Sequence, residues 1–283
     1  MKLFEYQAKQ LFRDAGIPVP RAELVHAPLL EADAQGLEGG DAGTTSGDAT
    51  AVNADAFALA VREAAGRLLA EASAVVVKSQ LLMGGRGKAG LIKLAATAEE
   101  AGDHARAFAT GPYRVPTVLV EEAVSIDREL YLSISPDPGP ARLVVLASAE
   151  GGVEIEELAK DRPEAIHRVG VDVNRGLQQY QARALAYGLG LEGNAVKQFV
   201  SILTGLYTVF TTHDAELAEI NPLFLTTDGS LLAGDGKVSI DDNSLFRQPG
   251  FERTRAYYDS EAEYEAALDG IPYLQFDGDI SLM

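Results

Sequence analysis

The chain has 283 residues, 47% of them hydrophobic, and no cysteine, which excludes disulfides, thiol chemistry and zinc–thiolate sites. Its formal net charge of −18 argues against nucleic acid and anionic membranes as partners, because their phosphates would be repelled over most of the surface. A cytoplasmic protein is expected, since the N-terminus predicts an amphipathic helix rather than a signal peptide, and the longest apolar run, residues 199–210, is too short to span a bilayer.

Helical and strand patterns alternate along the chain and predict a mixed α/β or α+β protein. The first helix is expected within residues 1–16, with Lys9 among its exposed side chains, and the first strand over residues 21–26. Residues 28–55 are rich in Ala, Gly, Asp and Thr and contain no Lys or Arg, so a flexible acidic insertion is expected there. Further helices are predicted over residues 55–72, 98–108, 150–159, 178–188, 194–211 and 251–268, and further strands over residues 75–78, 91–94, 117–121, 128–135, 141–148, 219–226 and 231–238.

The most informative stretch is a basic, glycine-rich loop between two of these strands. The first strand ends at Lys78, and the loop after it contains Gly85, Arg86 and Gly87. Glycine lets a backbone close over a ligand, because it has no Cβ and tolerates positive φ. Lysine and arginine are the cations that a polyphosphate recruits, and arginine makes bidentate contacts with its oxygens.

Two better-known phosphate motifs do not fit this loop. The dinucleotide fingerprint requires a helix directly after the glycines, but residues 91–94 alternate like a strand. The Walker motif requires Ser or Thr after Gly-Lys, where this chain has Ala89. What remains is a strand–loop–strand flap of the kind that covers nucleotide phosphates, and the alternative is a glycine-rich hairpin with solvated charges.

A second site is predicted at a hairpin that turns at residues 228–229, an Asp-Gly pair. With the turn there, Asn221 and Asp235 lie next to each other at its open end, and Glu219 is close by. Such oxygen ligands suit Mg²⁺, which completes its coordination with water and nucleotide phosphates. The alternative is an ordinary hairpin with polar ends.

A third pair of candidates is Glu121 and Glu129. Glu121 ends a predicted strand, so residues 122–124 are placed to offer backbone groups to a base edge while a carboxylate takes the ribose hydroxyls. Taken singly, each glutamate is more commonly a solvated surface charge. The flap, the two glutamates and the hairpin occur along the chain in the order that a nucleotide site of the grasp type requires. This order favours a nucleotide-binding role for the two glutamates.

Five stretches together resemble the β subunit of succinyl-CoA synthetase (succinate–CoA ligase). They are FEYQAK at 4–9, GGRGKAG at 84–90, EGGVEIE at 150–156, EINPL at 219–223 and LFRQP at 245–249. The resemblance implies an α+β fold with an ATP-grasp domain over residues 1–270, whose smaller lobe spans residues 21–110. It also implies that residues 271–283 begin a flavodoxin-like CoA-ligase domain that is otherwise missing from this chain.

The family pattern assigns roles residue by residue. Nucleotide contacts fall on Lys78, Gly85, Arg86, Gly87, Glu121, Val124 and Glu129, and magnesium ligands fall on Asn221 and Asp235. Arg86 and Glu219 match catalytic residues near a phosphohistidine. The implied activity is phosphoryl transfer between Mg-ATP or Mg-GTP and that histidine, which belongs to a partner α subunit that also binds CoA. The implied pathway is the tricarboxylic acid cycle.

This chain departs from the family at two loop positions, with Leu82 where a histidine is usual and Leu91 where a glycine is usual. Two rival interpretations stay open. A stand-alone ATP-grasp carboxylate ligase would need a carboxylate pocket within this chain. A truncated module that only binds nucleotide or the α subunit is favoured by Leu82 and by a final predicted strand at residues 272–276, whereas the intact Lys78, Asn221 and Asp235 count against it. Succinate is the expected acid, with another dicarboxylate as the alternative.

Overall fold

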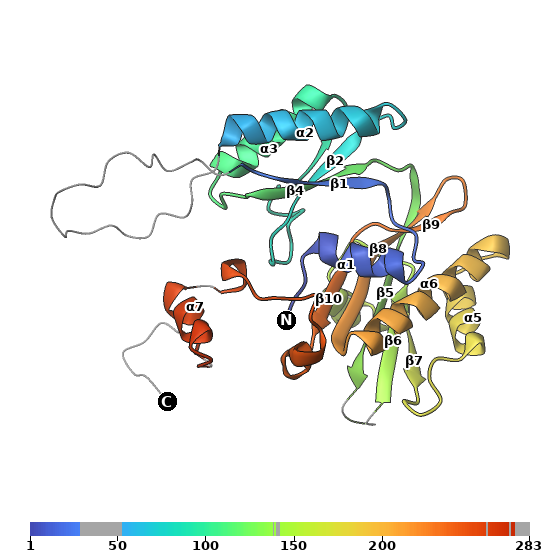
Figure 1. Ribbon diagram of the computed structural model, residues 1–283. Coiled ribbons are helices and arrows are strands. Elements are labelled where there is room, and N and C mark those ends of the chain that lie inside the picture. The colour runs from blue at the N-terminus through green and yellow to red at the C-terminus, as the bar shows by residue number, and fades with distance from the viewer. Residues whose placement is uncertain (29–52, 138, 140–141, 259, 272, 275–283) are drawn as a thin grey trace, which may run out of the picture.

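The computed structural model describes residues 1–28, 53–137, 139, 142–258, 260–271 and 273–274. Two lobes are stacked, and the helix α1 (Glu5–Asp14) lies between them (Figure 1). Nearly all of the acidic insertion predicted at residues 28–55 lies outside the described residues. So does most of the final strand predicted at residues 272–276, and its described positions 273–274 have no regular structure.

The smaller lobe is a four-stranded antiparallel sheet in the order β1-β4-β2-β3. Its elements are β1 (Ala22–His26), α2 (Ala54–Leu69), β2 (Val75–Ser79), β3 (Ile92–Ala95), α3 (Ala98–Thr110) and β4 (Thr117–Glu122). Helices α2 and α3 cover one face (Figure 1), where Val75, Val77 and Val120 are buried. Because side chains alternate along a strand, Lys78 and Glu121 point to the opposite face, toward α1.

The larger lobe has a sheet in the order β10-β8-β5-β6-β7, with β9 also paired to β8. Its elements are β5 (Ile126–Asp137), β6 (Arg142–Ser148), α4 (Ile155–Asp161), β7 (Ile166–Val171), α5 (Gln179–Gly188), α6 (Gly193–Thr212), β8 (Ala215–Thr226), β9 (Leu231–Ala233) and β10 (Lys237–Ile240). The core lies between this sheet and the helices α1, α5 and α6. Within the described ranges, no helix has both the length and the apolar character that crossing a membrane requires.

Several predicted elements differ from the structure. The helix predicted over residues 251–268 is α-helical only in α7 (Glu261–Leu268), which begins where Ser260 accepts a hydrogen bond from the Glu263 amide. The helix predicted from residue 150 starts five positions later, because residues 151–152 form a glycine turn. Strand β7 was not predicted.

In the glycine turn before α4, the backbone of Gly151 lies very close to the backbone of Leu130 on β5. A Cβ on Gly151 would lie 2.3 Å from the carbonyl oxygen of Leu130. We therefore expect Gly151→Ala to lower the free energy of unfolding by about 1–3 kcal/mol through overpacking, as measured by urea unfolding. Gly66→Ala is the matched control: Gly66 lies in α2 with nothing within 4 Å, so alanine should stabilise the protein by about 0.5–1 kcal/mol. A Gly151→Ala protein as stable as the wild type would contradict this packing.

Candidate functional site

A cleft of about 350 Å³ lies between the glycine loop of the smaller lobe and the β8–β10 region of the larger lobe. The predicted site residues that line it are Gly85, Arg86, Gly87, Glu219, Asn221 and Asp235. A larger cavity of about 590 Å³, between α1 and the strands β1 and β4, is lined by none of the predicted site residues. The chemistry-bearing side chains thus gather in the smaller of the two cavities.

The glycine loop folds as a tight turn that places Arg86 in the cleft. Gly85 has a φ of +70°, and the Leu91 amide donates to the Arg86 carbonyl at 2.9 Å. The Arg86 guanidinium is buried, and it donates to the Ser79 carbonyl at 2.7 Å. Its other terminal nitrogen lies 2.8 Å from Glu5 and 3.0 Å from Asp235. Burial disfavours the charge, but the two carboxylates outweigh burial and raise the pKa of Arg86.

The hairpin has the register that its turn predicted. Leu223 pairs with Ala233 on one side of a short interruption, and Glu219 pairs with Lys237 on the other. The same register places Asn221 opposite Asp235, at the interruption itself. The Asn221 side chain is fixed from the neighbouring loop, since it accepts a hydrogen bond from the amide of residue 152 at 2.7 Å and donates to the carbonyl of residue 153 at 3.0 Å.

Asp235 is a half-buried carboxyl of the cleft, with 30% of its side chain exposed. Burial and the nearby negative charge of Glu5 raise its pKa to about 6, although Arg86 and Lys78 act in the opposite direction. Asp235 and Asn221 both line the cleft, and their side chains carry the kind of oxygen that Mg²⁺ takes as a ligand. No cluster of three or more metal-binding side chains occurs within the part of the chain that is described.

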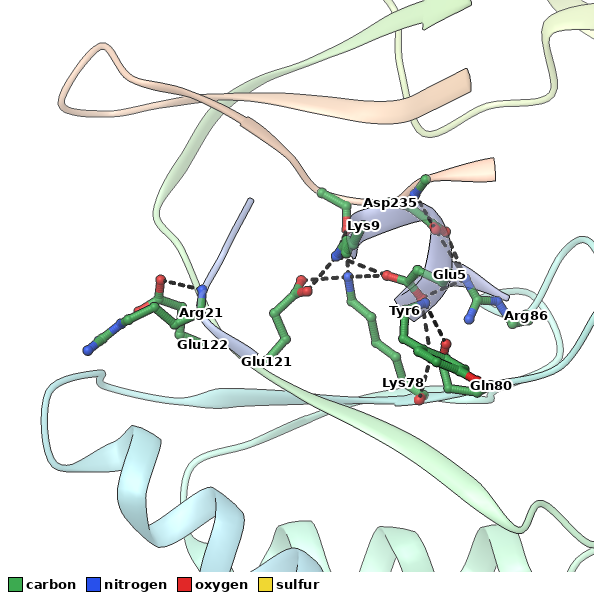
Figure 2. A network of polar contacts seen from close by, with 12 residues as sticks. Glu5, Tyr6, Lys9, Arg21, Lys78, Gln80, Arg86, Glu121, Glu122 and Asp235 are labelled. Atoms are coloured by element: carbon green, nitrogen blue, oxygen red, sulfur yellow. Dashed lines mark hydrogen bonds and ion pairs between the residues drawn. The ribbon is translucent and has the colours of Figure 1, made fainter. Parts of the chain in front are cut away.

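Lys78 lies behind the cleft, in a buried network with a second lysine (Figure 2). Lys9, predicted to be exposed, has no exposed surface at all, and this prediction is wrong. Helix α1 lies between two lobes, so a side chain opposite its large-lobe face is still covered by the smaller lobe. Both lysines contact Glu5 and Glu121. Burial disfavours the Lys78 charge, yet Glu5, Glu121 and Asp235 raise its pKa.

Glu5 and Lys9 were not predicted as site residues. Both lie in the stretch FEYQAK that carries part of the family resemblance, but their opposite charges four positions apart normally indicate a solvated surface pair on a helix. The structure shows instead that Glu5 contacts Lys9, Lys78 and Arg86 at 3.0, 3.2 and 2.8 Å. Burial raises the pKa of Glu5, but these three cations outweigh burial and hold that pKa below its ordinary value.

Glu219 is oriented by a tyrosine. The Tyr131 hydroxyl donates to the Glu219 carboxylate at 2.8 Å. Burial raises the pKa of Glu219, and the hydrogen bond from Tyr131 works against that rise. The cleft therefore contains the oriented carboxyl group of Glu219 in addition to the side chains of Asn221 and Asp235.

The other three candidates lie outside the cleft lining. Glu121 is buried and bonded to the lysine network. Val124 lies in the short connection between β4 and β5, which joins the lobes. Glu129 is exposed on β5, and its carboxylate approaches Gly152, where an added Cβ would be 2.2 Å away.

The two departures from the family pattern lie in different environments. Leu82 lines the cleft, so the usual histidine is replaced by an apolar side chain at its rim. Leu91 is buried in the core of the smaller lobe. Only Leu82 is therefore placed to change what the cleft binds.

Comparison with known proteins shows both a family and a shared fold. A family model described as an ATP-grasp domain matches residues 49–225. Subunit SauC of the ADP-forming sulfoacetate–CoA ligase of Bilophila wadsworthia is 47% identical, over 100% of this chain and 67% of that protein. The β subunit of the ADP-forming succinate–CoA ligase of Salinibacter ruber is 40% identical, over 100% of this chain and 68% of that protein. This chain thus spans about two thirds of the length of these relatives. The ATP citrate lyase of Methanothrix soehngenii, solved with citrate and coenzyme A, is 20% identical and shares the fold, with a TM-score of 0.56 over 94% of this chain and 59% of that one.

Proposed function

The chain belongs to the ATP-grasp family of ADP-forming CoA-ligase subunits, and on that premise we propose that it is the nucleotide-binding part of an acid–CoA ligase. In this proposal the cleft binds Mg-ATP or Mg-GTP. The chain then passes a phosphoryl group between the nucleotide and a histidine of a partner α subunit, which also binds CoA. The chain itself carries no residue that takes the phosphoryl group covalently in this scheme.

One observation carries the proposal: a flap cation meets a hairpin carboxylate across the cleft. Arg86 and Asp235 belong to different lobes, yet their charged groups lie 3.0 Å apart. Each neutralises the other in the free chain, so both are held in place before a ligand arrives. A triphosphate between them would find a cation on the flap side and metal-binding oxygens on the hairpin side.

The reaction needs charge stabilisation more than acid–base chemistry. Transfer to histidine breaks the bond between the γ-phosphorus and its bridging oxygen and forms a phosphorus–nitrogen bond, so negative charge is redistributed over the phosphate oxygens. Arg86, which lines the cleft, would counter that charge from the smaller lobe, and Lys78 would join it after turning away from its buried partners. Glu219, held by Tyr131, is placed to accept a hydrogen bond from the second ring nitrogen of the incoming histidine and so to orient the ring.

Asn221 and Asp235 would hold the magnesium ion, which neutralises phosphate oxygens when it is bound. The proposal therefore ties nucleotide affinity to the charge of Asp235. Of the remaining candidates, Val124 and Glu129 lie at or near the connection between the lobes and would contact the base and the ribose, whereas Glu121 is bonded to both buried lysines and would act through them.

The affinity for Mg-nucleotide is expected to fall as the pH is lowered through about 6. The raised pKa of Asp235, about 6, means that this carboxyl is ionised above that pH and takes up a proton below it, losing its charge as a metal ligand. Calorimetric titration with Mg-ATP from about pH 8 to about pH 5 measures this dependence.

The variant Asp235→Asn should bind Mg-ATP about tenfold more weakly at the higher pH and lose most of the pH dependence. Asp103→Asn, an exposed carboxylate of α3, is the control and should behave as the wild type. An Asp235→Asn protein with wild-type affinity for Mg-ATP would remove Asp235 from the metal site.

The acid is the second part of the proposal. The identity to the sulfoacetate–CoA ligase subunit SauC, 47% against 40% and 42% for two succinate–CoA ligase β subunits, favours sulfoacetate over the succinate that the family resemblance suggested. Both acids carry two negative charges, so the same ligase chemistry serves either. The test is to supply the complex of this chain and its α subunit with ATP, CoA and each acid, and to compare ADP release. Faster ADP release with succinate than with sulfoacetate would make succinate the preferred acid. It would also favour a place in the tricarboxylic acid cycle.

The nucleotide-binding claim is tested by calorimetry on the chain itself. We expect saturable binding of Mg-ATP or Mg-GTP, and weaker binding when the metal is removed with a chelator. A chain that binds neither nucleotide would contradict the proposed function.

A further inference from the structure

Two buried lysines share the same three acceptors behind the cleft (Figure 2). The Lys78 ammonium donates to Glu5, Glu121 and the Gly234 carbonyl at 3.2, 2.7 and 2.6 Å. The Lys9 ammonium lies 3.0 Å from Glu5, donates to the Gly234 carbonyl at 2.8 Å and also bonds Glu121. The two side chains therefore duplicate each other, although one comes from α1 and the other from β2.

This duplication uses every donor of both ammonium groups. An ammonium group has three N–H donors, so Lys78 has none left for a phosphate while its three contacts persist. Lys9 is completely buried and does not line the cleft. If Lys78 turns toward a phosphate, Lys9 still serves the carboxylates of Glu5 and Glu121. A buried carboxylate that loses its cation strongly destabilises the fold. The presence of Lys9 therefore decides whether the Lys78 ammonium can move away from Glu5 and Glu121.

We infer that Lys9 is a positioning residue that frees Lys78 for the nucleotide. Lys9 keeps Glu5, Glu121 and the Gly234 carbonyl satisfied while the Lys78 ammonium turns to the phosphates. The inference rests on the proposed function, because it requires a phosphate ligand in the cleft. Without Lys9, Lys78 is the only ammonium group on two buried carboxylates and is held there. Nucleotide affinity thus depends on a side chain that does not touch the nucleotide.

The test is a double-mutant cycle of Lys9→Met and Glu5→Gln, titrated calorimetrically with Mg-ATP and with inorganic tripolyphosphate at a temperature where circular dichroism shows each variant folded. Lys9→Met should weaken both ligands about tenfold. Glu5→Gln alone should weaken binding less than Lys9→Met does, because the loss of one carboxylate that holds Arg86 is offset by the loss of an anion that competes with phosphate. The double variant should regain most of the lost affinity, since one carboxylate and one cation are removed together. Arg13→Met removes an exposed charge from the same helix and should change neither affinity.

If Lys9 has a purely structural role, the effects of the two substitutions on affinity should add. If Lys9 frees Lys78, Glu5→Gln should instead restore most of the affinity that Lys9→Met loses. Unchanged affinity in Lys9→Met, or a double variant that binds no better than Lys9→Met, overturns the inference and leaves the proposed function intact, provided that the wild type binds Mg-ATP. A wild type that binds neither ligand overturns both. If Lys9→Met does not fold, the comparison of the double variant with Glu5→Gln decides: similar affinities support the inference, and a loss of about tenfold or more overturns it.

Discussion

Replacing Arg86 by alanine is expected to slow phosphorylation of the partner histidine about 100-fold, which corresponds to about 3 kcal/mol of barrier. The physical reason is preorganisation: the guanidinium is already buried in the cleft and fixed by the Ser79 carbonyl and by two carboxylates. The measurement is single-turnover transfer from Mg-ATP in the complex with the α subunit, followed by quantifying phosphohistidine.

The matched control for this substitution is Lys93→Ala. Lys93 is an exposed cation on β3, just beyond the flap, and does not line the cleft. The substitution Lys93→Ala removes one positive charge from the same lobe as Arg86→Ala does, and it should leave the transfer rate unchanged. Single-turnover transfer at the wild-type rate in Arg86→Ala would exclude Arg86 from the mechanism.

Replacing Lys9 by methionine is expected to cost about 3–5 kcal/mol of the free energy of unfolding, because it leaves buried carboxylates short of a cation. Lys9 has no exposed surface, and its partners Glu5 and Glu121 are buried with it. Urea unfolding monitored by circular dichroism measures the loss. Adding Glu5→Gln should recover part of this stability, because the remaining charges are then better balanced.

Arg13→Met is the control for stability as well. The side chain is exposed on the same helix, and its loss should change the free energy of unfolding by no more than about 0.5 kcal/mol. If Lys9→Met is no less stable than Arg13→Met, the buried network does not stabilise the fold in the way its geometry indicates.

Those parts of the site that depend on local pattern were predictable from the sequence. An Asp-Gly turn fixed the register of the hairpin, and the register alone places Asn221 opposite Asp235. Likewise, the alternation after the glycines predicted β3 in place of a helix, which excluded the dinucleotide motif. These features follow from backbone geometry over a few residues, so no knowledge of the rest of the fold was needed.

The buried network was not predictable in this way. Lys9 and Glu5 look like an ordinary surface pair until α1 is placed between two lobes, and nothing in the helix pattern reveals that placement. Long-range packing also explains the missed strand β7, which pairs with β6 at the end of the sheet order. The helix predicted over residues 251–268 failed for a different reason. Its charged, tyrosine-rich sequence shows little amphipathic order, and the regular α-helix starts only at the Ser260 cap.

A crystal structure of the chain with magnesium and a non-hydrolysable ATP analogue would show directly whether the nucleotide binds in this cleft. We expect the triphosphate to lie between the flap and the hairpin, with Arg86 on the phosphate oxygens and the metal on Asn221 and Asp235. A nucleotide bound in the larger cavity between α1 and the strands β1 and β4, with the Arg86–Asp235 pair intact, would contradict this expectation.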